Sequence, residues 1–486
     1  MMTFTLAAFD GSIALDRCEL CADTGPNFDV TNPATGEFLA AVPDMDAVTV
    51  SAVIDRAEAG WHGWRSLLAE EKFRLLKKWH DLILDNADAL ARILTSEQGK
   101  PLGEARGEVE FAARFVAWAA EDAKRVYGDV IPSSQRGWRT FVLKEPAGVS
   151  ALVTPWNFPA AMVTRKAATA LAAGCPVVLK PSELTPLTAI ALRRLAIEAG
   201  IPREVFSVVT CGRENVGDVG RMLATHESVR VVSFTGSTAV GKLLMQHAAS
   251  SVKKVCLELG GNAPFIVLED ADIENAIAEV VKSKFRNMGQ ACVAANRIFV
   301  HAAVYDKFAD GLVSAARTLR LGNGLDEATQ QGPLINAAAI SKVEAHIASA
   351  LESGATLLCG GSRADEGSNF FEPTVLANVA AGALFDEEET FGPVAPLYRF
   401  EDVNDVIRIA NASRSGLAAY VFGQDIQRVW RIVEALETGV VGINAGVVGS
   451  EVAPLGGRKE SGVGREGSRY GIEEFLETKY VCLAGI

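Results

Sequence analysis

Short apolar segments alternate with helix-like segments from residue 147 onward, and this alternation is the strongest constraint on the fold. Four strands, each apolar and bounded by turn residues, are predicted at 148–153, 176–179, 206–209 and 229–234. The segments 164–173 and 187–199 are predicted to be helices, and a glycine follows each of them at once. Wholly apolar strands that alternate with helices predict a doubly wound parallel sheet of the α/β class.

The rest of the chain divides into a second α/β run, a helical N-terminal part and two extended segments. Further strands are predicted at 263–267, 297–300, 357–359 and 396–400, with a helix at 304–319. Residues 46–125 carry apolar side chains at helical spacing. Residues 126–146 and the tail after Gly471 alternate as strands do. A chain of 486 residues exceeds what one hydrophobic core usually serves, so two or three domains are expected.

Composition narrows the class of protein. The net charge of −13 argues against nucleic-acid binding. No run approaches 18 uninterrupted apolar residues and the first ten residues carry no basic residue, so we expect neither a membrane span nor a secretory signal. Eight scattered cysteines fit a reducing, cytoplasmic setting. Cys18 and Cys21 form a C-x-x-C pair without a second pair of ligands, so we interpret them as ordinary thiols and expect no metal site.

Cys292 has a setting that none of the other cysteines shares. It follows a stretch rich in Gly, Asn and Gln, downstream of Glu258. A thiolate attacks carbonyl carbons near neutral pH, and a nearby carboxylate can activate water. Asn157, in the loop 154–159 after a strand, could donate to the resulting oxyanion, although a loop Asn is more often a turn residue. Together these residues indicate covalent chemistry on a carbonyl.

Two glycine-rich segments resemble nucleotide-binding motifs. Residues 236–242 match a P-loop except that Leu243 replaces the hydroxyl residue that holds Mg²⁺, which disfavours ATP hydrolysis. The turn can still bind a pyrophosphate, because it precedes a helix whose N-terminal N–H groups attract anions. Residues 462–467 match G-x-G-x-x-G but follow no predicted strand, so we discount them.

Lys180 and Glu183 come directly after a buried strand, where a parallel sheet opens into a crevice. A Glu there accepts hydrogen bonds from ribose hydroxyls and repels a 2′-phosphate, which predicts NAD rather than NADP. The alternative is a solvated Lys–Glu pair. The acidic run 386–389 is, by itself, interpreted as a solvated face.

Six ordered segments together resemble the signatures of the NAD(P)-dependent aldehyde dehydrogenase superfamily. They are Trp156–Pro159, Lys180–Glu183, Phe234–Ser237, Glu258–Gly261, Gly289–Cys292 and Glu389–Pro393. The likeness covers nearly the whole chain. Within the superfamily the chain looks most like succinate semialdehyde dehydrogenases, on the stretches Thr164–Lys166, Asn262–Val267, Ser283–Asn287 and Gly464–Glu473.

The resemblance implies a role for each motif. Cys292 forms a thiohemiacetal and then a thioester, Asn157 and the Cys292 N–H hold the oxyanion, and Glu258 activates the hydrolytic water. Lys180 is counted with these catalytic residues. The implied cofactor contacts are Thr154, Pro155, Trp156, Lys180, Ser182, Glu183, Gly236, Ser237, Glu389 and Phe391.

The resemblance also implies an aldehyde dehydrogenase-like fold of two doubly wound parallel-sheet domains and a β oligomerisation arm. The expected parts are a cofactor domain of 1–125 with 147–258, a catalytic domain of 259–445, an arm of 126–146 with 471–486, and a cleft loop region of 446–470. A two-stranded flap is stable only when it pairs with another subunit, so a homodimer or homotetramer is expected.

The expected substrate is succinate semialdehyde, which would be oxidised to succinate. Arg165 and Arg286 match the two arginines that clamp its distal carboxylate in these enzymes. A third contact, a Ser, aligns with Gly449, and the neighbouring Ser450 is the candidate to replace it. Ala294 also stands where many of these enzymes have a second cysteine. An aldehyde dehydrogenase for another carboxylated or aromatic aldehyde is therefore the alternative. A non-catalytic relative is disfavoured because Cys292 and Glu258 are both present.

Overall fold

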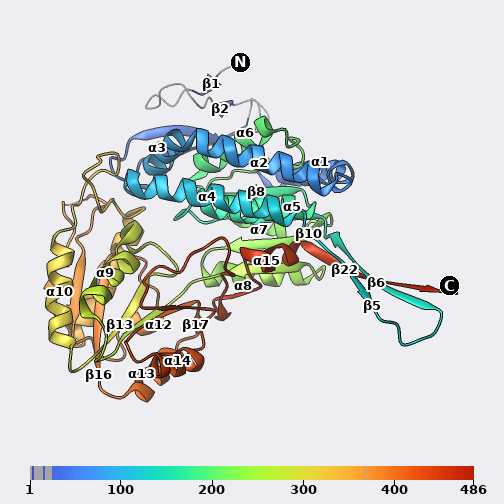
Figure 1. The fold of residues 1–486 in the computed structure, drawn as a ribbon. Coiled ribbons are helices and arrows are strands. Elements are labelled where there is room, and N and C mark those ends of the chain that lie inside the picture. The colour runs from blue at the N-terminus through green and yellow to red at the C-terminus, as the bar shows by residue number, and fades with distance from the viewer. Residues whose placement is uncertain (1–2, 5–14, 17–24, 366, 486) are drawn as a thin grey trace.

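A computed structural model describes residues 3–4, 15–16, 25–365 and 367–485. Cys18, Cys21 and most of the first ten residues lie outside this part of the chain. Figure 1 shows a layer of helices over one sheet, a second sheet flanked by its own helices, and an arm that projects to one side. Short β pairs lie outside these sheets: β1 (Thr3–Phe4) with β2 (Leu15–Asp16), and β17 (Ser415–Gly416) with β20 (Arg458–Lys459).

The first sheet has six strands in the order β21-β11-β10-β7-β8-β9. They are β7 (Val149–Val153), β8 (Val177–Lys180), β9 (Phe206–Val208), β10 (Val229–Thr235), β11 (Lys254–Glu258) and β21 (Gly462–Val463). All are parallel except β21. The strand order reverses between β7 and β10. In open α/β sheets such a switch point opens a crevice beyond the carboxyl ends of the strands.

Helices cover this sheet. They are α1 (Ala47–Arg65), α2 (Ala69–Asp85), α3 (Ala87–Gln98), α4 (Leu102–Asp122), α5 (Ala161–Ala173), α6 (Pro186–Ala199), α7 (Val216–Thr225) and α8 (Thr238–Ala249). Gly174 and Gly200 end α5 and α6 in the left-handed conformation, at φ 98° and 105°, as glycine C-caps do. The buried indoles Trp64 and Trp79 donate to the backbone oxygens of α5 and α6, which fixes the outer helices on the inner ones.

The second sheet has seven strands in the order β14-β15-β16-β13-β12-β18-β19. They are β12 (Ala263–Val267), β13 (Ala295–His301), β14 (Thr356–Cys359), β15 (Thr374–Ala377), β16 (Val394–Phe400), β18 (Ala418–Phe422) and β19 (Val440–Ile443). Only β14 is antiparallel to its neighbour. The associated helices are α9 (Ile273–Lys284), α10 (Tyr305–Arg317), α11 (Ala337–Glu352), α12 (Leu384–Glu387), α13 (Val403–Asn411) and α14 (Ile426–Ala435). The α/β class and the two parallel sheets predicted from the sequence are thus confirmed.

The projecting arm is a three-stranded antiparallel sheet. The strand β6 (Trp138–Pro146) lies between β5 (Asp129–Ile131) and β22 (Leu476–Ala484). Two short helices, α15 (Ser468–Gly471) and η3 (Ile472–Phe475), lead into β22. The arm exposes several large apolar side chains, namely Val130, Ile131, Leu143, Tyr480 and Leu483.

Several elements were not predicted from the sequence. Among them are the hairpin of β3 (Asn27–Thr31) and β4 (Phe38–Pro43) and the helices α9, α11 and α13. Among the described residues no helix is both long and apolar enough to cross a bilayer.

Candidate active site

Two cavities meet at Cys292. One, of about 340 Å³, lies between α4, α5 and the segment around Cys292, and is lined by Phe158, Arg165 and Arg286 among others. The second, of about 410 Å³, is lined by Trp156, Gly236, Ser237 and Glu389 among others. Cys292 and Met162 belong to the walls of both. A thiol at the junction of two cavities can contact a ligand from either side. We name the first the aldehyde cavity and the second the dinucleotide cavity, after the ligands that the family resemblance implies for their residues.

A left-handed turn presents Cys292. Asn287, Met288 and Gly289 have φ values of 50°, 55° and 72° in succession, which is costly for the two residues that have a Cβ. Tertiary contacts hold the turn: the Asn287 amide nitrogen Nδ2 donates to the backbone oxygens of Asn157 and Gln290. At Gly289 a Cβ would lie 2.2 Å from the Gly392 oxygen, so only glycine fits there. The strained turn thus lies directly before Cys292, the nucleophile expected from the sequence.

The surroundings of Cys292 favour its protonated form. Burial raises the pKa of the thiol to about 12, with smaller contributions from the carboxylates of Glu389 and Glu258, while Arg165 acts in the opposite direction. The thiol therefore needs a proton acceptor close by in order to react as a thiolate.

Glu258 is suited to accept protons. It ends β11 beside Thr235, the last residue of β10, and neither of its buried carboxyl oxygens has a hydrogen-bond partner among the described residues. Burial, and then the charge of Glu466, raise the pKa of Glu258 well above its usual range, while Lys166 lowers it. A carboxylate with a raised pKa is a stronger base near neutral pH.

Sequence reasoning missed Lys166 and Glu466 as members of the site. Their buried side chains form an ion pair, and Lys166 Nζ also donates to Ser233 Oγ at 3.0 Å. Arg165 lies 3.7 Å from the other Glu466 oxygen. Both residues fall inside stretches that carried the family resemblance, but their contact joins positions 300 apart in the chain. No local signal in the sequence indicates this pair.

Asn157 is held from three directions. Its backbone oxygen accepts from Lys100 Nζ at 2.7 Å and from Asn287 Nδ2 at 3.0 Å. Its side-chain Nδ2 donates to the Gln290 oxygen at 3.0 Å, two residues before Cys292. The amide expected to hold the oxyanion is therefore tied directly to the turn that presents the thiol. Lys100, which sequence reasoning also missed, is fully buried and paired with Glu108 at 2.5 Å.

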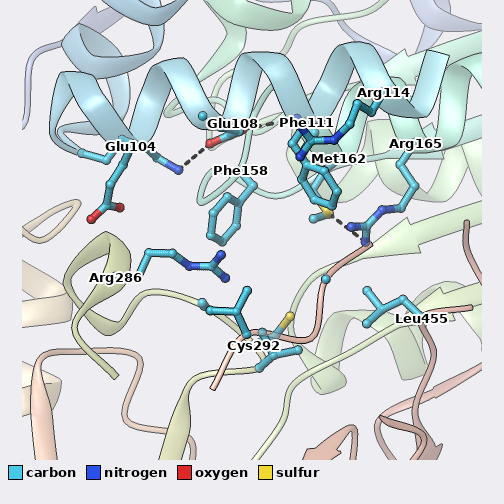
Figure 2. Close-up of a pocket in the computed structure, with 17 residues that line it drawn as sticks. Glu104, Glu108, Phe111, Arg114, Phe158, Met162, Arg165, Arg286, Cys292 and Leu455 are labelled. Atoms are coloured by element: carbon cyan, nitrogen blue, oxygen red, sulfur yellow. Dashed lines mark hydrogen bonds and ion pairs between the residues drawn. The ribbon is translucent and has the colours of Figure 1, made fainter. Parts of the chain in front are cut away.

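Arg165 and Arg286 enter the aldehyde cavity from α5 and from the segment after α9. Figure 2 shows them on opposite sides of the space above Cys292. The buried Nε of each has no hydrogen-bond partner among the described residues. Gly449 lines this cavity, and a Cβ there would lie 3.7 Å from the Phe111 ring. Ser450 is not part of the wall; its Oγ accepts from the Val452 N–H at 3.4 Å.

Most of the residues expected to bind a cofactor line the dinucleotide cavity. Ser237 caps the 12-residue helix α8, so the N–H groups of its first turn face the cavity end. The rings of Trp156 and Phe391 pack edge to face, with their centroids 5.4 Å apart. The carboxylate of Glu389 accepts from the Gly261 N–H at 3.3 Å, and burial raises its pKa to about 8. Pro155 and Gly236 complete the wall. Glu389 thus lies in the site and not on a solvated face.

The other expected cofactor residues lie at the carboxyl ends of β7 and β8. Thr154 is buried, and its Oγ1 has no partner among the described residues. Lys180 is buried at the end of β8, with Nζ 3.6 Å from Glu183 Oε2. Ser182 Oγ accepts from the Leu184 N–H at 3.2 Å. None of these four residues is in the wall of either cavity at Cys292. No cluster of three potential metal ligands occurs in the described part of the chain.

Comparison with known proteins gives consistent matches. The aldehyde dehydrogenase family model matches residues 21–481. The chain is 54% identical to succinate-semialdehyde dehydrogenase [NADP(+)] GabD of Escherichia coli K12 over 96% of both chains. It is 52% identical to glutarate-semialdehyde dehydrogenase of Pseudomonas aeruginosa over 97% of both. A crystal structure of an E. coli NADP-dependent enzyme superposes with a TM-score of 0.94 at 54% identity, over 96% of both chains.

These matches overturn one expectation from the sequence. NAD was expected in preference to NADP, yet the E. coli relative and the superposed structure are both named for NADP. The expectation depended on Glu183 as a free carboxylate that repels a 2′-phosphate. The structure instead sets Glu183 against the ammonium group of Lys180, which offsets that charge. The extent and strength of the matches leave no doubt about the family: this chain belongs to the aldehyde dehydrogenases, enzymes that oxidise aldehydes to carboxylic acids.

Proposed function

We propose that this aldehyde dehydrogenase oxidises succinate semialdehyde to succinate with NADP. The observation that supports this substrate is that Arg165 and Arg286 both line the cavity that holds Cys292, and that the buried Nε of each has no hydrogen-bond partner among the described residues. A buried donor without a partner costs about 1–3 kcal/mol. A substrate carboxylate between the two arginines satisfies both donors and forms charge-assisted hydrogen bonds.

The chemistry proposed for the site starts at Cys292. Glu258 takes the thiol proton, because neither of its oxygens has a hydrogen-bond partner in the described part of the chain and its pKa is raised. The sulfur adds to the aldehyde carbon to form a thiohemiacetal, and Asn157 Nδ2 with the Cys292 N–H stabilises its oxyanion. Asn157 then exchanges its bond to the Gln290 oxygen for one to the oxyanion. Loss of hydride leaves a thioester. Glu258 releases the thiol proton to solvent and, as a carboxylate again, accepts a proton from the water that hydrolyses the thioester.

The residues of the dinucleotide cavity fit a nicotinamide dinucleotide. The N-terminus of α8 provides donors for a pyrophosphate, and Glu389 is an acceptor for ribose hydroxyls. Such a cofactor supplies the acceptor for the hydride that leaves the substrate. Trp156 and Phe391 bound the cavity and help to exclude water from the thioester. The two relatives named for NADP support NADP as the cofactor.

A second substrate is favoured by the shape of the aldehyde cavity. Gly449 presents no side chain toward Phe111, so the wall leaves room for a longer chain. The relative from P. aeruginosa is named for glutarate semialdehyde, which is one methylene longer. The second candidate is therefore a five-carbon ω-carboxy aldehyde oxidised by the same mechanism.

Two further expectations stay proposals. We propose that 147–258 with 1–125 forms the cofactor domain, 259–445 the catalytic domain and 446–470 the cleft loop region. We also propose that the arm of 126–146 and 471–486 joins subunits of a homo-oligomer. The exposed apolar side chains of the arm support this role.

The decisive experiment is a panel of aldehydes followed by absorbance at 340 nm. We expect kcat/KM for succinate semialdehyde to exceed kcat/KM for hexanal, and to be higher with NADP than with NAD. Arg286→Ala raises KM for succinate semialdehyde far more than for hexanal. An equal increase in KM for the two aldehydes would contradict the proposal that Arg286 binds the substrate carboxylate. If Cys292→Ala retained turnover, the proposed covalent mechanism would be contradicted.

A further inference from the structure

A third guanidinium group, that of Arg114, lies on the wall of the aldehyde cavity. The helix α4 contributes five residues to this wall, namely Glu104, Gly107, Glu108, Phe111 and Arg114. Their spacing of three or four positions places them on one face of the helix. At about 1.5 Å of rise per residue, this face is about 15 Å long. It runs from the carboxylates of Glu104 and Glu108 at one end to a cation at the other.

Arg114 lies nearer to solvent than the buried Arg165. Its guanidinium carbon is 5.2 Å from the centroid of the Phe111 ring, and that of Arg165 is 6.0 Å from the same centroid. The side chain of Arg114 is 52% exposed, whereas that of Arg165 is 4% exposed. Figure 2 shows Arg114 beside Phe111, on the side of the cavity away from Cys292. The two cations therefore flank one aromatic ring at different depths.

Glu451 holds Arg114 across the mouth of the cavity. Its Oε2 lies 3.5 Å from Arg114 Nε. The loop that carries Glu451 also supplies Val447, Gly449 and Leu455 to the cavity wall. The backbone oxygen of Glu451 accepts from the Ser468 N–H at 2.8 Å, which anchors the loop. A partly exposed ion pair of this kind contributes little free energy, so a second carboxylate can replace Glu451 at Arg114.

We propose that Arg114 determines specificity for aldehydes whose distal carboxylate extends past Arg165 and Arg286, and that Glu451 competes with this carboxylate for the guanidinium group. The substrate class is ω-carboxy aldehydes longer than four carbons, with glutarate semialdehyde as the first member to test. This inference rests on the proposed function, because it extends the same carboxylate recognition to a longer chain.

The test measures the ratio of kcat/KM for glutarate semialdehyde to kcat/KM for succinate semialdehyde. Arg114→Ala and Arg114→Gln lower this ratio by up to about fivefold, the loss of one partly exposed ion pair. Glu451→Gln raises the ratio, because it frees Arg114. In the double variant Arg114→Ala/Glu451→Gln the ratio equals that of Arg114→Ala, since Glu451 acts only through Arg114. About 0.5 M NaCl reduces these differences through screening.

The matched control is Arg106→Ala. Arg106 is on the same helix, outside the cavity wall, in an exposed ion pair with Asp88. If Arg114→Ala and Arg106→Ala give the same ratio, the inference is overturned. Arg165→Ala distinguishes this failure from failure of the proposed function. If Arg165→Ala abolishes the preference for succinate semialdehyde over hexanal, the carboxylate clamp of Arg165 and Arg286 is supported and only the proposed role of Arg114 is contradicted. If the parent enzyme prefers no carboxylated aldehyde over hexanal, both the proposed function and the proposed role of Arg114 are contradicted.

Discussion

Glu104 accepts a hydrogen bond from the backbone N–H of Asn287 at 2.8 Å. This bond joins the helix that lines the aldehyde cavity to the left-handed turn that presents Cys292. Burial raises the pKa of Glu104, while Lys100, the Asn287 N–H and Arg286 lower it. A side chain from α4 thus stabilises a backbone conformation that the turn residues would not adopt by themselves.

Two substitutions of Glu104 should distinguish the effect of its hydrogen bond on kcat from the effect of its charge. Glu104→Gln retains an oxygen that can accept from Asn287, so we expect kcat within a few-fold of the parent enzyme. Glu104→Ala removes the acceptor and lets the turn relax, and a displacement of the nucleophile by about 1 Å can cost about 100-fold in rate. Steady-state kcat at saturating succinate semialdehyde checks this, with thermal melting as the control for folding. Equal losses in the two variants would assign the effect to the charge instead.

The pair Lys166–Glu466 should control the pH at which Glu258 works. Glu466 raises the pKa of Glu258 and Lys166 lowers it. The base acts when deprotonated, so the acid limb of the profile of kcat against pH follows this pKa. Glu466→Gln should therefore move the limb to lower pH, and Lys166→Met should move it to higher pH. The double variant Lys166→Met/Glu466→Gln, which removes both charges of the pair, should lie between them. Shifts in the same direction for both single variants would contradict this electrostatic role.

The sequence predicted those features of the fold that are encoded locally. The glycines after 164–173 and 187–199 indicated the ends of α5 and α6, and both adopt the left-handed conformation. Likewise, the residues after apolar strands indicated the crevice, because the ends of parallel strands meet at one edge of a sheet.

Contacts between distant segments could not be predicted in the same way. The turn at Asn287 and Met288 is left-handed although neither residue is a glycine, and its partners come from α4 and the loop of Asn157. The pairing of Lys166 with Glu466 joins segments that only the folded chain brings together. For Glu183 the residue type alone was misleading, since its effect on a phosphate depends on the ammonium group beside it.

The buried pair Lys100–Glu108 offers a test of stability. Glu108 also accepts from the N–H groups of Ala160 and Ala161 at the start of α5. Lys100→Met leaves a buried carboxylate without its cation, which typically costs about 3–5 kcal/mol. Lys100→Met/Glu108→Gln removes the unpaired charge and keeps an acceptor for the two N–H groups, so we expect it to recover part of the loss. Urea unfolding monitored by tryptophan fluorescence measures both. A double variant no more stable than Lys100→Met would contradict the role of the unpaired charge.

The contact between Lys180 and Glu183 should set the preference between the two dinucleotides. If Lys180 binds the 2′-phosphate of NADP, Glu183 competes for the ammonium group from 3.6 Å away. Glu183→Gln removes this competitor and the repulsion of the phosphate, and should raise the ratio of kcat/KM for NADP to that for NAD by about tenfold, the equivalent of about 1.4 kcal/mol. Lys180→Met should lower the same ratio. Glu198→Gln, an exposed position on α6 with the same change in net charge, is the matched control. The ratio is measured at one fixed concentration of succinate semialdehyde. If Glu183→Gln changes it no more than Glu198→Gln does, the phosphate is recognised by other residues.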